Sequence, residues 1–284
     1  MDDSTIFIAG ANGQLGTALR NLYKNARSAD IDELDITSKE SVNNYDWTGI
    51  DIIINAAAYT NVDSAETPEG RVTSWKVNAE AVGHLNRIAI ERGITLVHIS
   101  TEYVFDGSIT PHTENEPFTP LGVYAQTKAA GDIAASINPG HYIVRTSWVI
   151  GEGKNFVRTM LMLGQKGINP TVIADDIGRP TFTTELVKAI DHLLSNKASY
   201  GTYNLSNSGE PTSWANLTRA IFETANMNNV VTDTTNERYY GDKPNSAPRP
   251  HNSVFDLSKI ESTGFTPRDW KEDLKVYIEK ELNK

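Results

Sequence analysis

Residues 4–16 read STIFIAGANGQLG, an apolar run typical of a β-strand followed by three closely spaced glycines. From residue 14 onward apolar side chains recur at helical spacing, so the glycines lie between a strand and a helix. In such a turn the first glycine permits a tight bend, the second lets the backbone approach a pyrophosphate, and the third allows close packing of the helix. Gly10, Gly13 and Gly16 therefore predict a dinucleotide-binding turn, with the phosphates at the helix N-terminus.

Strands and helices continue to alternate beyond this turn. Apolar runs at 51–57, 95–100 and 141–147 predict buried strands, and helical patterns fill 69–92 and 121–137. This alternation predicts an α/β fold with a doubly wound parallel sheet, which is Rossmann-like.

The pattern loosens after residue 151, where short strands and loops separate the expected helices. These helices are expected at 155–165, 184–195, 213–225, 257–262 and 269–282. We therefore expect residues 1–150 to form a dinucleotide-binding domain and residues 151–284 a smaller, mixed α/β substrate lobe. Part of 182–206 is left open as an addition to the first domain.

The composition narrows the class of protein. A net charge of −10 argues against a nucleic-acid partner, because phosphate backbones are bound by clustered Lys and Arg. No apolar run approaches the roughly 20 residues of a membrane span, so we expect no membrane partner. The lack of cysteine excludes disulfides and thiolate metal ligands. Without a basic or apolar leader at the N-terminus, the cytoplasm is the expected location.

The residues after the turn leave the type of nicotinamide cofactor open. An acidic residue about 20 positions on commonly holds the adenosine ribose. Asp30 and Asp32 lie at about that distance, after a weakly patterned second strand. Lys24 and Arg27 are alternatives that could meet a 2′-phosphate instead. Both NADPH and NADH thus remain candidates.

Tyr124 and Lys128 form a candidate acid–base pair. Their i, i+4 spacing in an expected helix places both side chains on one helical face. A phenol has an unperturbed pKa of about 10, and a neighbouring cation lowers that pKa toward the working pH. Thr101 follows the strand at 95–100 at its carboxyl end, where doubly wound sheets bind their ligands. Its hydroxyl is therefore placed to share a substrate oxygen with Tyr124.

With these residues the chain resembles the extended short-chain dehydrogenase/reductase family, and within it the branch of dTDP-4-dehydrorhamnose reductases. The resemblance runs nearly end to end and includes the C-terminal half, where a generic dehydrogenase would not match. The segments that carry it are GANGQLG (10–16), LDIT (34–37), NAAAYTNVDSAE (55–66), VNA (77–79), STEYVFDG (100–107), PLGVYAQTK (120–128), RTSWVIG (145–151), GKNFVRTM (153–160), IGRPT (177–181) and PRPHNS (248–253).

The resemblance implies a reaction, a cofactor and a substrate. Thr101, Tyr124 and Lys128 would be the catalytic residues, with Tyr124 as the proton donor to a carbonyl oxygen. The reduced nicotinamide of NADPH or NADH would supply hydride to C4 of a dTDP-linked 4-keto-6-deoxy sugar. In this way dTDP-4-dehydro-L-rhamnose would become dTDP-L-rhamnose.

Further residues match binding positions of that family. Asn78 resembles an asparagine that supports the proton relay, and the cofactor would contact Gly10, Asn12, Gly13, Gln14, Leu15, Gly16, Asp35, Ile36, Ala56, Ala57, Tyr59, Asn78, Tyr124 and Lys128. The sugar would meet Val62, Thr101, Glu102, Tyr103 and Trp148. The nucleotide and diphosphate would meet Asn155, Arg179 and Arg249, because the arginine fork pairs well with phosphate.

The chain departs from the family pattern in several places. Glu102 stands where the family usually has Asp, and Ala125 where Gly is common. Ala18 replaces a glutamate that helps to hold a metal between subunits in some members, although Glu185 is available. We therefore expect no metal, and a monomer or a weak homodimer.

Two other functions remain open. A related reductase could act on another nucleotide-linked 4-keto-hexose, such as a UDP-linked or N-acetylated one. The second possible function is that of a non-catalytic regulatory subunit with the same fold, which would bind the cofactor. Such relatives generally lack the Tyr/Lys pair. Single residues also have structural alternatives: Tyr103 and Trp148 as core aromatics, and the two arginines as ion-pair partners of Asp175 or Asp176.

Overall fold

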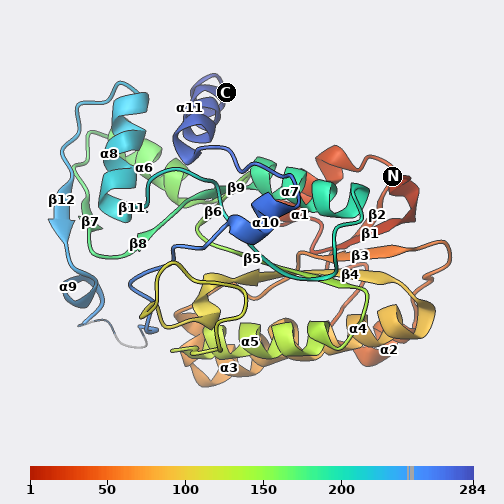
Figure 1. Cartoon of the computed structure of the whole chain (residues 1–284). Helices are drawn as coiled ribbons and strands as arrows, with labels where there is room; N and C mark the ends of the chain where they lie inside the picture. Colours follow the sequence, from red (N-terminus) through yellow and green to blue (C-terminus); the bar gives the residue numbers. More distant parts are fainter. Residues whose placement is uncertain (242, 244–245) are drawn as a thin grey trace.

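A six-stranded parallel sheet forms the centre of the computed structural model, which describes residues 1–241, 243 and 246–284 (Figure 1). The strand order is β10-β5-β4-β3-β1-β2, so the direction of winding reverses between β1 and β3. This arrangement confirms the predicted doubly wound α/β fold. The strands are β1 (Ile6–Ala9), β2 (Arg27–Ala29), β3 (Ile52–Asn55), β4 (Thr95–Thr101), β5 (His141–Thr146) and β10 (Gly201–Leu205).

Helices cover both faces of this sheet (Figure 1). One face carries α1 (Gln14–Leu22), α7 (Thr183–Ser195) and α10 (Ser258–Ser262), and the other carries α2 (Lys39–Asn44), α3 (Pro68–Trp75), α4 (Ala81–Arg92) and α5 (Val123–Ser136). On the first face, Leu19, Ile190 and Ile260 share one buried apolar cluster. On the second face, Val42 and Leu85 belong to another. Apolar burial on both faces explains why the central strands are near-continuous apolar runs.

A smaller lobe lies beyond the carboxyl ends of the strands (Figure 1). It comprises β6 (Val149–Ile150), α6 (Phe156–Gln165), β7 (Thr171–Ile173), β8 (Ile177–Gly178), β9 (Thr181–Phe182), β11 (Thr212–Ser213), α8 (Trp214–Thr224), β12 (Thr232–Thr234), α9 (Asn236–Tyr240) and α11 (Trp270–Leu282). Its own core joins Leu161 of α6, Ile221 of α8 and Ile278 of α11.

The chain leaves the sheet at β6 and later returns to it. α7 and β10, which lie within 182–206, pack on the sheet and extend its edge, because β10 pairs in parallel with β5. The side chain of Gln14 at the start of α1 also accepts a hydrogen bond from the backbone nitrogen of Gly151 at 2.8 Å. The domain boundary at 150/151 therefore remains a proposal. In this division, residues 182–206 contribute α7 and β10 to the domain that contains the sheet.

Two helical details differ from the sequence-based expectation. The helix expected at 69–92 is divided, because a π-helical turn at Lys76–Glu80 separates α3 from α4. Such turns are frequent at functional sites. α9 was not expected at all, since its five residues are too few to show a clear period.

None of the described helices is long and apolar enough to cross a membrane. Within the described residues there is also no group of three or more His, Cys, Asp and Glu side chains that could hold a metal ion. The carboxylate of Glu185 is engaged within the fold, where it accepts the backbone N–H of Arg268 at 2.8 Å and lies 3.4 Å from Lys188 Nζ.

Candidate active site

The turn between β1 and α1 requires glycine at two positions. Gly10 has φ +76°, and a Cβ there would lie 2.6 Å from the backbone nitrogen of Ala57. At Gly16 a Cβ would overlap the carbonyl oxygen of Gly10. Gly13 precedes α1 as its N-cap, and no side chain of the described residues caps this helix. The first N–H groups of α1 are thus without a side-chain acceptor, as phosphate binding needs.

A cavity of about 430 Å³ opens beside this turn, at the point where the winding of the sheet reverses. Its size is typical of small-molecule sites, which occupy about 300–1,000 Å³. The glycine contacts, the free helix end and the largely apolar wall together fit a dinucleotide. The lining includes these residues that the sequence assigned to the cofactor: Gly10, Gly13, Asp35, Ile36, Ala56, Ala57 and Tyr59.

Three other turn residues have structural contacts instead. The side chain of Leu15 packs in the core, and that of Gln14 accepts from Gly151. Asn12 donates its backbone N–H to Asp30 Oδ2 at 2.9 Å. None of the three lines the cavity, so their contact with a cofactor stays a prediction.

Asn78 holds one residue of the cavity wall, Tyr59, in place. It is 1% exposed, and its side-chain oxygen accepts the backbone N–H of Tyr59 at 2.8 Å. Its amide donates to Tyr59 O at 3.0 Å and to Thr127 Oγ1 at 3.1 Å. Asn78 therefore fixes Tyr59, which lines the cavity, against the helix that carries Tyr124.

Glu66 sets the start of that helix, α5. Its Oε1 accepts the backbone N–H of Val123 at 2.8 Å, and a Cβ at Gly122 would lie 2.7 Å from the same oxygen. A carboxylate at a helix N-terminus satisfies an otherwise unpaired donor and favours the helix dipole. Sequence reasoning did not single out Glu66, although the residue ends the segment NAAAYTNVDSAE.

Tyr124 lies buried in the first turn of α5, at 9% exposure. Its ring packs edge-on against Tyr103, with the ring centres 5.4 Å apart. Burial, together with the negative charge of nearby Glu102, raises the pKa of Tyr124. The expectation of a lowered pKa was therefore wrong in direction. A raised pKa keeps the phenol protonated at neutral pH, which suits a proton donor.

Lys128 lies one turn further along α5 and is 2% exposed. Its ammonium donates to the backbone oxygen of Ile99 in β4 at 2.6 Å. Burial lowers the pKa of Lys128 to about 8, against the opposing effect of Asp132. The lysine is thus anchored to the strand that ends at Thr101.

Thr101 and Glu102 share a buried hydrogen bond at the end of β4. Thr101 Oγ1 donates to Glu102 Oε2 at 2.7 Å and accepts the backbone N–H of Tyr103 at 3.3 Å. Burial raises the pKa of Glu102 to about 7, although hydrogen bonds from Thr101 and Ser253 oppose the shift. A hydroxyl has one proton. While Glu102 is ionised, its carboxylate accepts that proton from Thr101 in a hydrogen bond, and Thr101 has none left to donate to a substrate. A protonated Glu102 can donate instead, which frees that proton for a substrate oxygen.

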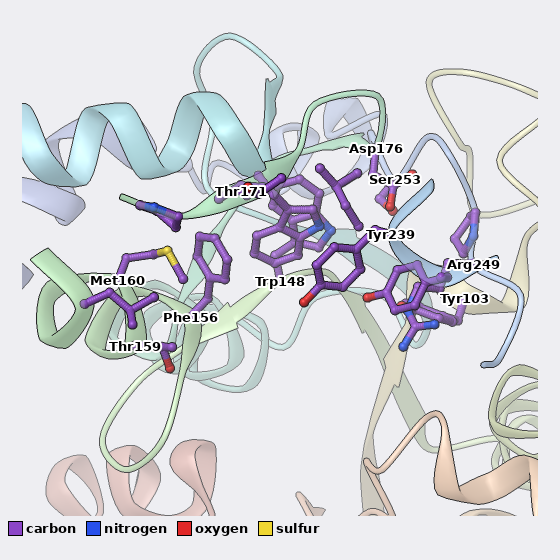
Figure 2. Close-up of a pocket in the computed structure, with 17 residues that line it drawn as sticks. Tyr103, Trp148, Phe156, Thr159, Met160, Thr171, Asp176, Tyr239, Arg249 and Ser253 are labelled. Carbon is purple, nitrogen blue, oxygen red and sulfur yellow. The ribbon is translucent and has the colours of Figure 1, made fainter. Parts of the chain in front are cut away.

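A second cavity, of about 420 Å³, has Tyr103 in its wall, and because six of its 17 lining residues are aromatic we call it the aromatic cavity. Figure 2 shows Phe156 and Trp148 toward one end, Tyr103 and Arg249 toward the other, and Tyr239 between them. The indole of Trp148 stacks on Trp214 with the ring centres 3.6 Å apart. Because both indoles line the cavity, the space beside this stacked pair fits a flat ring such as a nucleobase.

Trp148 owes its position to the backbone. It has φ +45°, which is uncommon for a residue with a side chain. A Cβ at Gly178 would lie 2.8 Å from Trp148 Cε2, so glycine makes room for the indole. Trp148 therefore both packs against the core of the smaller lobe and lines the cavity.

The three residues assigned to the nucleotide and diphosphate are not brought together. Arg249 lines the aromatic cavity, pairs with Asp63 at 2.7 Å and lies 4.0 Å over the ring of Tyr240. Arg179 donates to the backbone oxygens of two loop residues, at 2.8 and 3.0 Å. Asn155 caps α6 by accepting the N–H of Arg158. Neither Arg179 nor Asn155 lines either cavity, so their role in binding remains a prediction.

Sequence reasoning missed most of the aromatic wall. Trp214 begins α8, and Tyr239 and Tyr240 end α9, but nothing in their spacing marks them as neighbours. The available signal was weak, namely two adjacent tyrosines in a polar stretch. The ion pairs with Asp175 or Asp176 were also wrong for both arginines, because Arg249 pairs with Asp63 and Arg179 donates to backbone oxygens.

Tyr124 packs against one wall residue of each cavity, although it lines neither cavity itself. It shares one apolar cluster with Tyr59, which lines the dinucleotide cavity, and with Tyr103, which lines the aromatic cavity. Val62 packs in the same cluster. The walls of the two cavities are therefore joined through side chains that pack on Tyr124.

The chain matches the family model described as RmlD substrate binding domain over residues 4–283. A dTDP-4-dehydrorhamnose reductase from Aggregatibacter actinomycetemcomitans is 38% identical, and the match covers 95% of this chain and 97% of that protein. This chain belongs to the dTDP-4-dehydrorhamnose reductase family. The resemblance drawn from the sequence motifs is thereby confirmed.

Solved structures of the family agree with the fold. A reductase of this name from Clostridium acetobutylicum superposes with a TM-score of 0.90 at 36% identity, covering 96% of this chain and 98% of that one. Another, from Bacillus anthracis in complex with NADP, gives a TM-score of 0.89 at 33% identity, covering 97% and 98%. The match thus includes the smaller lobe as well as the sheet.

Proposed function

We propose that this chain reduces the C4 carbonyl of dTDP-4-dehydro-L-rhamnose, with NADPH or NADH as reductant, to give dTDP-L-rhamnose. Membership of a family of NAD(P)H-dependent reductases supports the reaction class. The observation that carries the proposal is that Tyr124 packs against Tyr59 of the dinucleotide cavity and Tyr103 of the aromatic cavity. This arrangement suits a proton donor that serves a cofactor in one cavity and a nucleotide-linked sugar in the other.

Each catalytic side chain has a separate task in this proposal. The reduced nicotinamide, when bound, supplies the hydride. Tyr124 donates its proton to the carbonyl oxygen, and its raised pKa keeps that proton in place beforehand. Thr101 donates a hydrogen bond to the same oxygen once its proton is released by Glu102. Lys128, held by Ile99 and one helical turn from Tyr124, supplies a positive charge that stabilises the phenolate that forms.

The aromatic cavity supports a nucleotide-linked substrate. We assign the nucleobase to the slot near Trp148 and Trp214 and the diphosphate to the end near Arg249. Arg249 is 13% exposed and already paired with Asp63 on one side, so it is held in place to meet an anion with its remaining donors. The sugar would then lie between Arg249 and Tyr124, beside Tyr103.

The test is turnover by the purified chain. We expect dTDP-4-dehydro-L-rhamnose to be consumed with loss of reduced nicotinamide absorbance, and the product to be identified as dTDP-L-rhamnose by mass spectrometry and NMR. A parallel reaction with a UDP-linked 4-keto-hexose separates the related reductase activity. Folded protein that oxidises neither cofactor with either sugar would contradict the proposal and favour a regulatory subunit.

We further propose that the protein acts in the cytoplasm as a monomer or a weak homodimer. Its proposed cofactor and nucleotide-linked substrate are metabolites of that compartment. Fractionation of cells and sedimentation of the purified chain test the two statements separately.

A further inference from the structure

Asp30 directly follows β2, and both Asp30 and Ile31 line the dinucleotide cavity. Its Oδ2 accepts the backbone N–H of Asn12 at 2.9 Å, and its Oδ1 accepts that of Ile31 at 2.9 Å. One of these bonds comes from the glycine turn itself. The carboxylate is therefore held in a fixed position between the turn and the cavity, where a strand-end acid meets the adenosine ribose.

The basic residues of this region are directed elsewhere. Arg27 donates to the backbone oxygens of Asp46 at 2.8 Å and Thr48 at 2.6 Å. Lys24 lies 3.4 Å from the side-chain oxygen of Asn21. Among the described residues that line the cavity there is no Lys or Arg, and the charged ones are Asp30 and Asp35.

Arg20 is a competing cation on the side of the glycine turn. Its guanidinium donates to Asn12 Oδ1 at 3.2 Å, and Asn12 in turn contacts Asp30. Arg20 does not line the cavity. A 2′-phosphate on the ribose would thus meet the fixed carboxylate of Asp30 before it met a cation, and like charges at close range repel.

We propose that Asp30 makes this chain prefer NADH to NADPH. The carboxylate accepts a hydrogen bond from the ribose 2′-hydroxyl of NADH and repels the 2′-phosphate of NADPH. The proposal rests on the proposed function only in taking this cavity as the cofactor site. A hydrogen bond to a charged group contributes about 1.5–3 kcal/mol, so we expect a preference of roughly tenfold to a hundredfold.

The experiment measures dissociation constants of NADH and NADPH by nicotinamide fluorescence, without sugar substrate. We expect wild-type protein to bind NADH at least about tenfold more tightly. The variant Asp30→Asn keeps an oxygen for the N–H of Asn12 but removes the charge. It should bind NADPH more tightly than wild type does and bring the ratio of the two constants close to one.

Two further variants make the result specific. Glu33→Gln removes a neighbouring acid whose Oε2 accepts the N–H of Asp30 at 2.9 Å but which does not line the cavity. It should leave the ratio unchanged. Arg20→Ala should leave NADPH binding unchanged as well, and a selective loss of NADPH affinity in that variant would assign the 2′-phosphate to Arg20.

Several outcomes overturn the preference. They are equal or tighter binding of NADPH by wild type, an unchanged ratio in Asp30→Asn, or no binding of either cofactor. A clear preference for NADH in a protein that does not reduce the sugar would leave this proposal standing and contradict only the proposed function.

Discussion

The two cavities on either side of the Tyr124 cluster are built by different means. Most residues of the dinucleotide cavity lie at or just after the ends of β1, β2 and β3, and its backbone turn is shaped by Gly10 and Gly13. The aromatic cavity is formed by large side chains from segments as far apart as Tyr103 and Ser253. A site made from backbone demands glycine at fixed spacing, whereas a site made from side chains demands only that distant segments meet. The first demand is visible in a sequence and the second is not.

The largest expected effect is on turnover, at Tyr124. Tyr124→Phe removes the proton donor but leaves the ring that packs on Tyr103. We expect kcat to fall by about 10²–10⁴-fold, with cofactor affinity unchanged. Single-turnover kinetics and fluorescence titration measure the two quantities. Tyr200→Phe, at an exposed tyrosine on the far edge of the sheet, is the matched control. Turnover at the wild-type rate by Tyr124→Phe would rule out Tyr124 as the donor.

The second effect concerns Glu102, whose pKa is raised from 4.5 to about 7 by burial. Between these values the folded protein holds a proton that the unfolded chain has released, so the free energy of unfolding falls as pH rises through this window. The loss from this group should be about 3 kcal/mol. Urea unfolding at several pH values measures it. Glu102→Gln should abolish this loss across the window, and an equal pH dependence in both proteins would show that Glu102 ionises normally.

The third effect concerns only the glycine turn of the dinucleotide cavity. Gly16→Ala places a Cβ against the carbonyl oxygen of Gly10, and we expect a loss of about 1–3 kcal/mol in the free energy of unfolding. Gly83→Ala in α4 is the control, because a Cβ there meets open space. It should stabilise the protein by about 0.5–1 kcal/mol. Chemical denaturation compares the two, and a tolerated Gly16→Ala would contradict the close approach.

The smallest effect concerns the aromatic cavity. Trp214→Ala removes the ring that stacks on Trp148. Trp214 also lines the proposed nucleobase site, and one aromatic contact with the base contributes about 0.5–1.5 kcal/mol, so KM for the dTDP-sugar should rise roughly threefold to tenfold while cofactor affinity stays constant. Trp75→Ala, at an exposed tryptophan of α3, serves as control. A parallel loss of cofactor affinity in Trp214→Ala would show that the two cavities are not independent.

The sequence predicted the sheet because its signals are local. Each central strand is an apolar run and each helix has a period, so the parallel sheet and the dinucleotide turn followed from short windows. Thr101, Tyr124 and Lys128 were also found locally, from a strand end and an i, i+4 pair.

The parts that the sequence did not predict depend on tertiary contacts. The raised pKa of Tyr124 comes from burial beside Glu102, which no spacing reveals. Glu66 caps α5 from a segment 57 positions away. Likewise the stacking of Trp148 on Trp214 joins the end of β5 to the start of α8. Such contacts are set by the packed fold and leave no mark on either segment by itself.

The return of the chain to the sheet through α7 and β10 bears on how such enzymes can be recombined. A hybrid that joins residues 1–150 of this protein to the remainder of a relative would combine α1 of one parent with α7 of the other, across a buried interface that includes Leu19 and Ile190. It would also pair β5 with a foreign edge strand. A hybrid with two junctions, which retains 182–206 with the sheet, avoids both mismatches. Exchange of substrate lobes between relatives is therefore expected to succeed only with discontinuous inserts.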